Sequence, residues 1–205
     1  MPDALPSQTI SPSSSPRRSA GRMPDVSVIV AVRDHEDVVG HEVRDLGEHL
    51  ATLGLDFEIL AVNDGSVDNS FPVLGLLARH MPELAILRGD SRGRPFARGI
   101  AEARAASVLL IEAGGRVSQS LDRLAWAMSR LATGSDAVVF RGACIVARRL
   151  RVRPIVARVS GSGPAFERAF ERRATDLRVD IVGRRPARQP AVHRLLGPVL
   201  RLLAA

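Results

Sequence analysis

Short apolar runs alternate with helical stripes from residue 26 to residue 140, and no other feature limits the fold so strongly. The first run, VSVIVAV at residues 26–32, is continuous and rich in β-branched side chains, as in a strand buried on both faces. Four similar runs follow, at residues 57–62, 84–88, 107–113 and 136–140. Strands buried on both faces need helices above and below them, so these runs favour a mostly parallel sheet.

The segments between the runs carry apolar residues at helical spacing. The clearest stripe consists of Val39, Val43, Leu46, Leu50 and Leu53. Strand and helix therefore alternate through short links, which predicts an α/β fold with helices on both faces of the sheet. Ligands of such sheets bind beyond the carboxyl ends of the strands, so the residues that follow each strand are the ones to read for function.

We expect three parts in the chain. Residues 1–22 are rich in Pro and Ser, lack an apolar period and are predicted to be disordered. Residues 23–150 hold the alternating core. Residues 151–205 form a short helical extension, in which a stripe from Phe166 marks a helix and residues 179–182 a strand.

The charge of the chain is high and uneven. All 29 basic residues are arginine, and residues 141–205 hold 15 of them against four acids. Compositional bias explains the choice of arginine over lysine. Aromatic residues make up only 3% of the chain and no nucleic-acid motif occurs, so nucleic-acid binding is not expected. With one cysteine, no signal-peptide pattern and no apolar run near the roughly 18 residues of a spanning helix, we expect a cytoplasmic protein.

Polar motifs follow the predicted strands. AVRDHED closes the first strand, VNDGSVDNS at 62–70 the second and LLIEAGGRVS at 109–118 the fourth, and RGDSRGRPFARGIAEARAA at 88–106 lies between the last two. In this order and spacing, over residues 26–150, the set resembles the family 2 glycosyltransferases of GT-A fold. The NDGSVDNS stretch carries the resemblance most specifically, and ARGIAEA is next. The resemblance implies a Rossmann-like GT-A core that binds a nucleotide-sugar donor.

A nucleotide site is expected at these strand ends. An aspartate there can accept hydrogen bonds from a base N–H or from ribose hydroxyls, and Asp64 is placed for this role, with Gly65 allowing a tight turn. The residues expected around the nucleotide are Arg33, Asp34, Asp64, Gly65, Ser66, Arg98 and Glu112. A simpler alternative stays open, in which DGS is only a turn that caps the following helix.

The diphosphate of the donor is expected to meet arginine. The stretch 88–106 is rich in Gly and Arg and enters a helix, so its backbone N–H groups and guanidinium groups suit an anion. The residues assigned to this role are Arg92, Arg94, Arg116, Arg148 and Arg149. The alternative is an ordinary solvated basic loop.

The family pattern fails at its metal-binding element. Relatives typically close this strand with D-A-D-D, whose carboxylates hold a divalent cation against the leaving diphosphate. Here Glu112 keeps one carboxylate, and Gly114 stands at the second acid. Hard cations need several oxygen ligands, so Glu112, the one candidate ligand, makes a poor Mg²⁺ or Mn²⁺ site by itself. Either arginine replaces the metal, or the domain binds without turnover, and both interpretations stay open.

Two acids are candidates for the general base that the family needs. Glu167 and Glu171, in GSGPAFERAFERRA, share one face of a predicted helix, although a salt-bridged helix surface explains them as well. The resemblance then implies an inverting glycosyltransferase with a glycan or a lipid carrier as its hydroxyl acceptor. The alternative is an inactive binding or partner module with the same fold.

Residues 151–205 are expected to complete the acceptor side of the core. Their positive charge and the apolar stripe that ends the chain suit peripheral contact with the inner face of a membrane.

Overall fold

The computed structural model describes residues 22–90, 92–115 and 123–183. Its strands are β1 Val26–Val32, β2 Phe57–Asn63, β3 Leu84–Arg88, β4 Ser107–Glu112, β5 Ala137–Phe140, β6 Cys144–Arg148 and β7 Val179–Val182. Its helices are α1 Val39–Thr52, α2 Ser70–Ala78, α3 Pro95–Glu102, α5 Leu124–Ala132, α6 Arg149–Val156 and α7 Gly163–Arg173. Arg116 and the apolar stripe that ends the chain lie outside the described residues.

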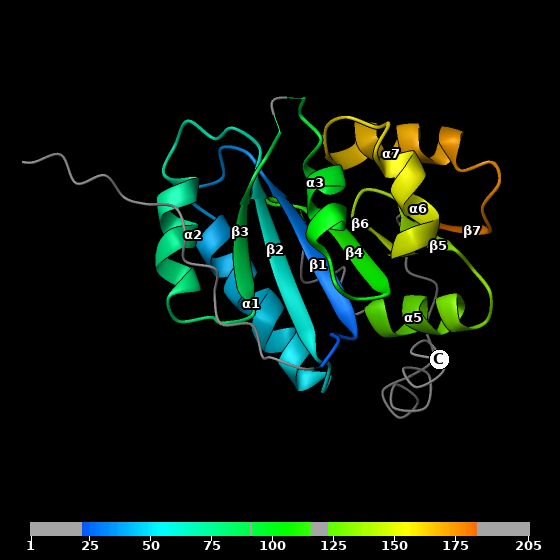
Figure 1. Ribbon diagram of the computed structural model, residues 1–205, viewed down its shortest axis with the longest axis horizontal. Helices are drawn as coiled ribbons and strands as arrows, with labels where there is room; N and C mark the ends of the chain where they lie inside the picture. Colours follow the sequence, from blue (N-terminus) through cyan, green and yellow to red (C-terminus); the bar gives the residue numbers. More distant parts are fainter. Residues whose placement is uncertain (1–21, 91, 116–122, 184–205) are drawn as a thin grey trace, which may run out of the picture.

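The seven strands form one sheet in the order β3-β2-β1-β4-β6-β5-β7 (Figure 1). Strands β3, β2, β1 and β4 run parallel, and β6 pairs antiparallel with both β4 and β5. β7 adds a parallel edge strand beside β5. The predicted α/β fold, a mostly parallel sheet between helices, is confirmed.

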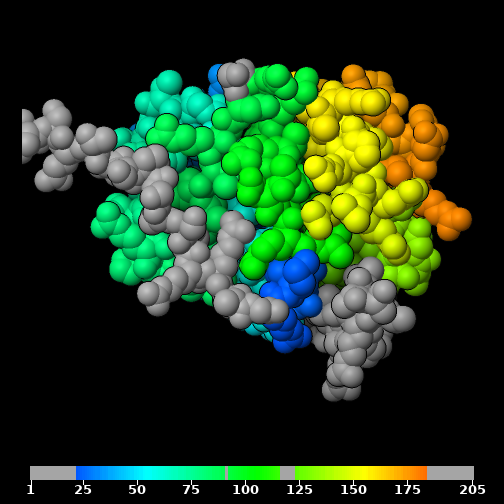
Figure 2. Space-filling model, viewed as in Figure 1, coloured from blue at the N-terminus to red at the C-terminus, as the bar shows by residue number. Residues whose placement is uncertain are grey.

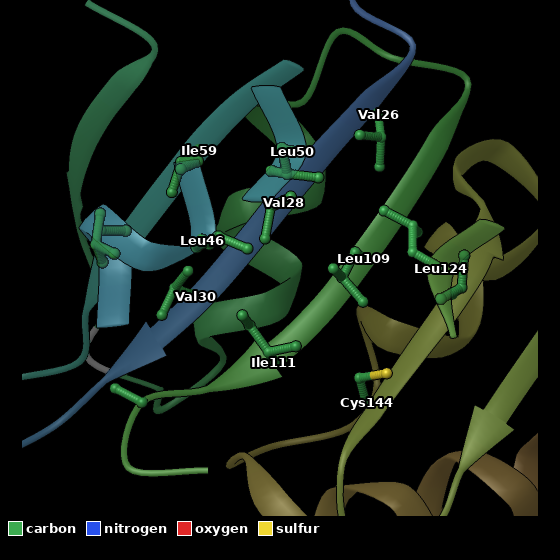
Figure 3. Packing of buried hydrophobic residues seen from close by; sticks show 14 of the residues in the cluster. Val26, Val28, Val30, Leu46, Leu50, Ile59, Leu109, Ile111, Leu124 and Cys144 are labelled. Carbon is green, nitrogen blue, oxygen red and sulfur yellow. The ribbon is translucent and has the colours of Figure 1, made fainter. Parts of the chain in front are cut away.

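Alternate residues of β1 serve two separate cores. Val28 and Val30 belong to the core under α1, α2 and α5, whereas Ile29 belongs to the core under α3, α6 and α7. Figure 3 shows the first core, where Leu46 and Leu50 of α1 pack against the valines of β1. Each fully buried aliphatic side chain of this kind contributes about 1.5–3 kcal/mol, which is why the apolar runs of the sequence determine the sheet.

The strand β6 and the helix α6 were not expected from the sequence. Phe140 ends β5, and Gly142, with φ of +73°, helps the chain reverse direction before β6 begins at Cys144. The chain therefore returns to the amino edge of the sheet before α6 carries it back. Within the described residues, no helix combines the length and the apolar character that crossing a bilayer requires.

Candidate active site

Hydrogen bonds join the loop after β1 to the loop after β2. The backbone N–H of Val67 donates to Asp34 Oδ1 at 2.7 Å, and the N–H of Asp34 donates to Ser66 Oγ at 3.1 Å. The N–H of His35 donates to Ser70 Oγ at 2.9 Å. Asp34 and Ser66, both expected at the nucleotide, thus use side-chain oxygens to order the rim of the site. Neither Asp64 nor Ser66 caps α2, which begins after Asn69 without a side-chain cap.

Asp64 follows β2 and faces a glycine loop. Its N–H donates to Val32 O at 2.8 Å, and a Cβ on Gly89 would lie 2.8 Å from Asp64 Oδ1. Gly65 takes the positive φ of +82° that the tight turn was expected to need. Among the described residues none donates a hydrogen bond to the Asp64 carboxylate, which is half-buried. An acceptor of this kind suits a ligand that brings its own N–H or O–H groups.

The charges around Asp64 oppose one another. Burial raises the pKa of the Asp64 carboxyl, nearby Arg33 lowers it, and Asp90 raises it. Arg33 is exposed and lies close enough to act on Asp64, so the structure brings these two predicted residues together.

Glu112, at the end of β4, meets the loop that leads into α7. Ser162 Oγ donates to Glu112 Oε1, and Gly163 lies against Oε2 so closely that a Cβ there would collide with it. The N–H of Gly161 donates to Gly93 O at 2.7 Å, which joins the same loop to the predicted diphosphate loop. Sequence reasoning gave the GSGPAF piece no role. Its signal was the pair of glycines, both of which take positive φ.

Neighbouring residues contact Gly114, which stands where the family pattern has its second acid. Gly114 has φ of +75°, and its N–H donates to Glu42 Oε2 at 2.8 Å. A Cβ on Gly114 would lie 2.8 Å from Cε1 of His35. Burial raises the pKa of the Glu42 carboxyl, against the Gly114 hydrogen bond and the charge of His35, which lower it. The sequence analysis assigned no role to His35 or to Glu42, yet both residues contact Gly114.

A divalent metal does not fit this corner. In the described ranges no three His, Cys, Asp or Glu side chains gather as metal ligands. Glu112 accepts a hydrogen bond from Ser162, and the imidazole of His35 lies close to the position that the Cβ of an acid at residue 114 would take. The described residues at this corner therefore supply too few carboxylates for a Mg²⁺ or Mn²⁺ site.

The two candidate bases differ sharply. Glu167 is 8% exposed, and its Oε2 accepts the N–H of Gly142 at 2.8 Å. Burial raises the pKa of the Glu167 carboxyl, partly offset by that hydrogen bond. Glu171 instead forms a two-bond ion pair with Arg141, at 3.1 and 2.8 Å. Glu171 thus matches the salt-bridge alternative, whereas Glu167 does not.

Glu112 and Glu167 line one small cavity of about 50 Å³ at the carboxyl edge of β4. Its wall also includes Phe96, Gly115 and Gly163. A larger groove of about 600 Å³ lies between α1 and α2, lined mainly by aliphatic side chains and away from these acids. The carboxyl-edge cavity is therefore the place where two of the residues predicted for the site, Glu112 and Glu167, come together.

Two predicted arginines lie at the wrong edge of the sheet. Arg148 pairs with Ser107, the first residue of β4, and its guanidinium donates to Leu131 O and Ser135 O at 2.6 and 3.2 Å. Arg149 donates to Ala105 O at 2.8 Å. Both residues follow the unexpected strand β6, which carries the chain away from the strand ends. The structure therefore does not bring Arg148 and Arg149 to the edge where the diphosphate was expected.

The other predicted arginines have varied surroundings. The guanidinium of Arg94 donates to Ala157 O at 2.9 Å, although its Nε is buried without a partner among the described residues. Arg98 pairs with Glu102 on α3 at 2.6 Å. Arg92 is exposed on the loop before α3, and only its backbone N–H is bound there, to Asp90 at 3.2 Å. Among the arginines predicted for the site, Arg33 and Arg92 are exposed at this edge, and in the described part of the chain no ion pair joins either of them to an acid.

Restoring the missing acid should destabilise the protein. A Gly114→Asp side chain would adopt left-handed backbone and press on His35, so we expect a loss of about 2 kcal/mol, or roughly 4–8 °C in Tm. Gly54→Asp is the matched control, because Gly54 also has positive φ, of +69°, but nothing lies within 4 Å of its Cβ position. Thermal unfolding with and without Mn²⁺ measures both variants. A Gly114→Asp protein as stable as the control and further stabilised by Mn²⁺ would contradict the steric argument.

Comparisons with known proteins find structural likeness without sequence likeness. No protein-family model matches the chain, and no curated protein matches it. The mannosyltransferase PcManGT from Pyrobaculum calidifontis, in complex with GDP-Man and Mn²⁺, matches with a TM-score of 0.61 at 14% identity, over 83% of this chain and 56% of its own. A mycobacterial protein matches with a TM-score of 0.59 at 15% identity, over 88% and 74%.

Glucosyl-3-phosphoglycerate synthase from Mycobacterium tuberculosis, in complex with Mn²⁺, UDP and phosphoglyceric acid, has a TM-score of 0.56 at 15% identity, over 90% of this chain and 79% of its own. This chain thus spans little more than half of the mannosyltransferase and about four fifths of the synthase. Such identities speak for the fold alone. The seven-stranded sheet, with its helices on both faces, is the GT-A fold of these glycosyltransferases.

Proposed function

We propose that this protein is a glycosyltransferase of the family 2 type, which moves a sugar from a nucleoside-diphosphate donor to a hydroxyl acceptor. One observation carries the proposal: the buried acid Glu167 and the strand-end acid Glu112 line the same cavity. Asp64 stands at the end of β2 with a carboxylate to which no described residue donates. A fold shared with nucleotide-sugar enzymes supports the same assignment.

The donor would span the carboxyl ends of the parallel strands. Asp64 accepts hydrogen bonds from the base or ribose, and Arg33 and Arg92 supply positive charge for the diphosphate. Ser162 orients Glu112, which in turn contacts the sugar. Because a metal does not fit beside Gly114, charge neutralisation falls to guanidinium groups.

The chemical step is a single displacement. The acceptor oxygen forms a bond to the anomeric carbon, and the bond from that carbon to the diphosphate oxygen breaks, so the nucleoside diphosphate leaves with the electron pair. Glu167 takes the acceptor proton. Its raised pKa makes it a stronger base than an exposed glutamate, as general-base catalysis requires.

Residues 151–205 belong to the acceptor side in this proposal, because α7 supplies Glu167 from beyond residue 150. The acceptor is a glycan or a lipid-linked sugar at the inner face of the cytoplasmic membrane, reached by peripheral contact.

A second candidate is a binding module without turnover. The small cavity favours it, since Ser162 and Gly163 pack directly on Glu112 and leave only about 50 Å³. Such a module would bind the nucleotide through Asp64 and yield no product.

A thermal-shift series tests donor binding. UDP or GDP and their sugars should raise Tm by about 5–10 °C at a hundred-fold excess over Kd, equally with and without Mn²⁺. Asp64→Asn should remove this shift, because Asn presents one oxygen where the carboxylate presents two. Asp176→Asn, at an exposed position after α7, is the isosteric control and should retain it. No shift with any nucleotide would contradict both candidate functions, and a shift that needs Mn²⁺ would contradict metal independence.

A further inference from the structure

Helices α6 and α7 lie side by side on one face of the sheet (Figure 1). Val152 and Val156 of α6 pack into the same core as Phe166 and Phe170 of α7. The opposite sides of both helices therefore point away from the sheet, on the face where α3 also lies. Figure 2 shows this region, in yellow and orange, as a continuous part of the surface.

The outer side of α6 carries an apolar ridge. Leu150 is 68% exposed, and Pro154 and Ala157 are exposed as well. Their spacings of four and three residues align them along the helix, opposite the buried valines. Hydration of such a ridge is unfavourable, and no described segment covers it.

Arginines frame this ridge. Arg153 lies on one flank of α6, while Arg151 and Arg158 lie on the other, and Arg151 pairs with Asp136 at 2.9 Å. On α7, Arg168 and Arg172 lie one turn apart on the outer side. In the described part of the chain no ion pair joins Arg153, Arg158, Arg168 or Arg172 to an acid. These four guanidinium groups can therefore bind an anionic partner.

We propose that the outer face of α6 and α7 docks on an anionic lipid bilayer. An apolar ridge between guanidinium groups matches the boundary of a bilayer, where acyl chains lie just below phosphate headgroups. A nucleic acid would use the charges but would gain nothing from Leu150. The docking argument does not depend on glycosyl transfer. If transfer is correct, a lipid-linked acceptor would arrive close to the cavity, since Gly163 and Pro164 at the start of α7 line it.

Vesicle flotation with the full chain tests the surface. The protein should float with vesicles of phosphatidylcholine mixed with phosphatidylglycerol, and should stay behind with phosphatidylcholine alone. Each arginine near an anionic surface contributes about 1 kcal/mol, so the double variant Arg153→Gln/Arg168→Gln should lower partitioning about thirty-fold. Arg44→Gln/Arg79→Gln, at exposed positions on α1 and after α2, removes the same charge from the other side of the sheet and should leave partitioning within two- to three-fold.

Leu150→Asn separates a bilayer from a nucleic acid. It leaves the charge unchanged and should lower vesicle partitioning about tenfold, because one exposed leucine no longer enters the interface. Equal losses in the two arginine pairs would overturn the proposal by showing non-specific attraction. Retained binding in Arg153→Gln/Arg168→Gln would place the contact on another surface. A third outcome would assign the surface to nucleic acid instead. In that outcome the protein does not bind vesicles but binds duplex DNA or RNA, and its affinity for the duplex is lowered by Arg153→Gln/Arg168→Gln and unchanged by Leu150→Asn.

Discussion

Glu167→Gln should reduce sugar transfer by about 10²- to 10⁴-fold while leaving donor binding intact. The variant keeps the shape of the side chain and an oxygen that can accept the Gly142 N–H at 2.8 Å, so the fold should be retained. It removes only the ability to take a proton from the acceptor. Transfer from the donor identified by thermal shift, followed as released nucleoside diphosphate, measures the loss.

Glu171→Gln is the matched control for this experiment, one helical turn away on α7. Its carboxylate is held by Arg141, so we expect at most a few-fold change in rate. Similar losses of transfer rate in Glu167→Gln and Glu171→Gln would mean that transfer depends on the negative charge of α7 in general and not on Glu167 as a base. An unchanged rate in Glu167→Gln would remove Glu167 as the base. A wild-type protein that binds nucleotide without releasing product would favour the binding module.

The pH profile gives an independent reading of the same residue. Burial raises the pKa of Glu167, and a base must be ionised to accept a proton, so the rate should rise with pH through a value above that of an ordinary glutamate. The acid limb of this profile should disappear in Glu167→Gln. A limb at the ordinary glutamate value in the wild type would contradict the role of a buried base.

The fold was predictable because its central strands are buried on both faces. The run at 26–32 matches β1 residue for residue, and the acids that follow β2 and β4 reach the same edge as expected. Parallel pairing guarantees this result, since every carboxyl end of a parallel strand meets one edge. Strand burial alone therefore placed Asp64 and Glu112 at the same edge of the sheet without any side-chain information.

The errors arose where the chain changes direction without a periodic signal. Cys144–Arg148 has only five residues, so its apolar part did not stand out, and Arg148 and Arg149 were assigned to the wrong edge. The role of His35 depends on the space above Gly114, which no spacing rule reveals. Contacts between residues far apart in the sequence decide whether the position of a missing acid is open or is contacted by another side chain, as His35 contacts Gly114.

Glu58→Ala should destabilise the protein strongly, although Glu58 lies away from the candidate site. Glu58 is 2% exposed and accepts hydrogen bonds from Ser27 Oγ at 2.6 Å, from the N–H of Arg104 at 2.7 Å and from Arg104 Nε at 2.9 Å. Without Glu58 the buried Ser27 hydroxyl and the Arg104 N–H lose their acceptor, and each buried group left without a partner costs about 1–3 kcal/mol. The Arg104 guanidinium is about a third exposed, so water compensates part of its lost ion pair. Urea denaturation measures this as a lower midpoint at an unchanged m-value.

The pH dependence of stability identifies the charge of Glu58 as the cause. Burial alone would raise the pKa of this carboxyl, but the hydrogen bonds from Ser27 and Arg104 and the charge of Arg104 outweigh it and hold the pKa below the ordinary value. A group whose pKa is lowered by folding stabilises the protein above its unfolded pKa, and this stabilisation is lost as pH falls through the folded value. Glu58→Ala should therefore flatten the acid side of the stability curve. Glu83→Ala, at an exposed position before β3, should cost no more than about 0.5 kcal/mol and leave that curve unchanged. If both variants lose equal stability, the Ser27–Glu58–Arg104 network does not hold β1, β2 and the start of β4 together.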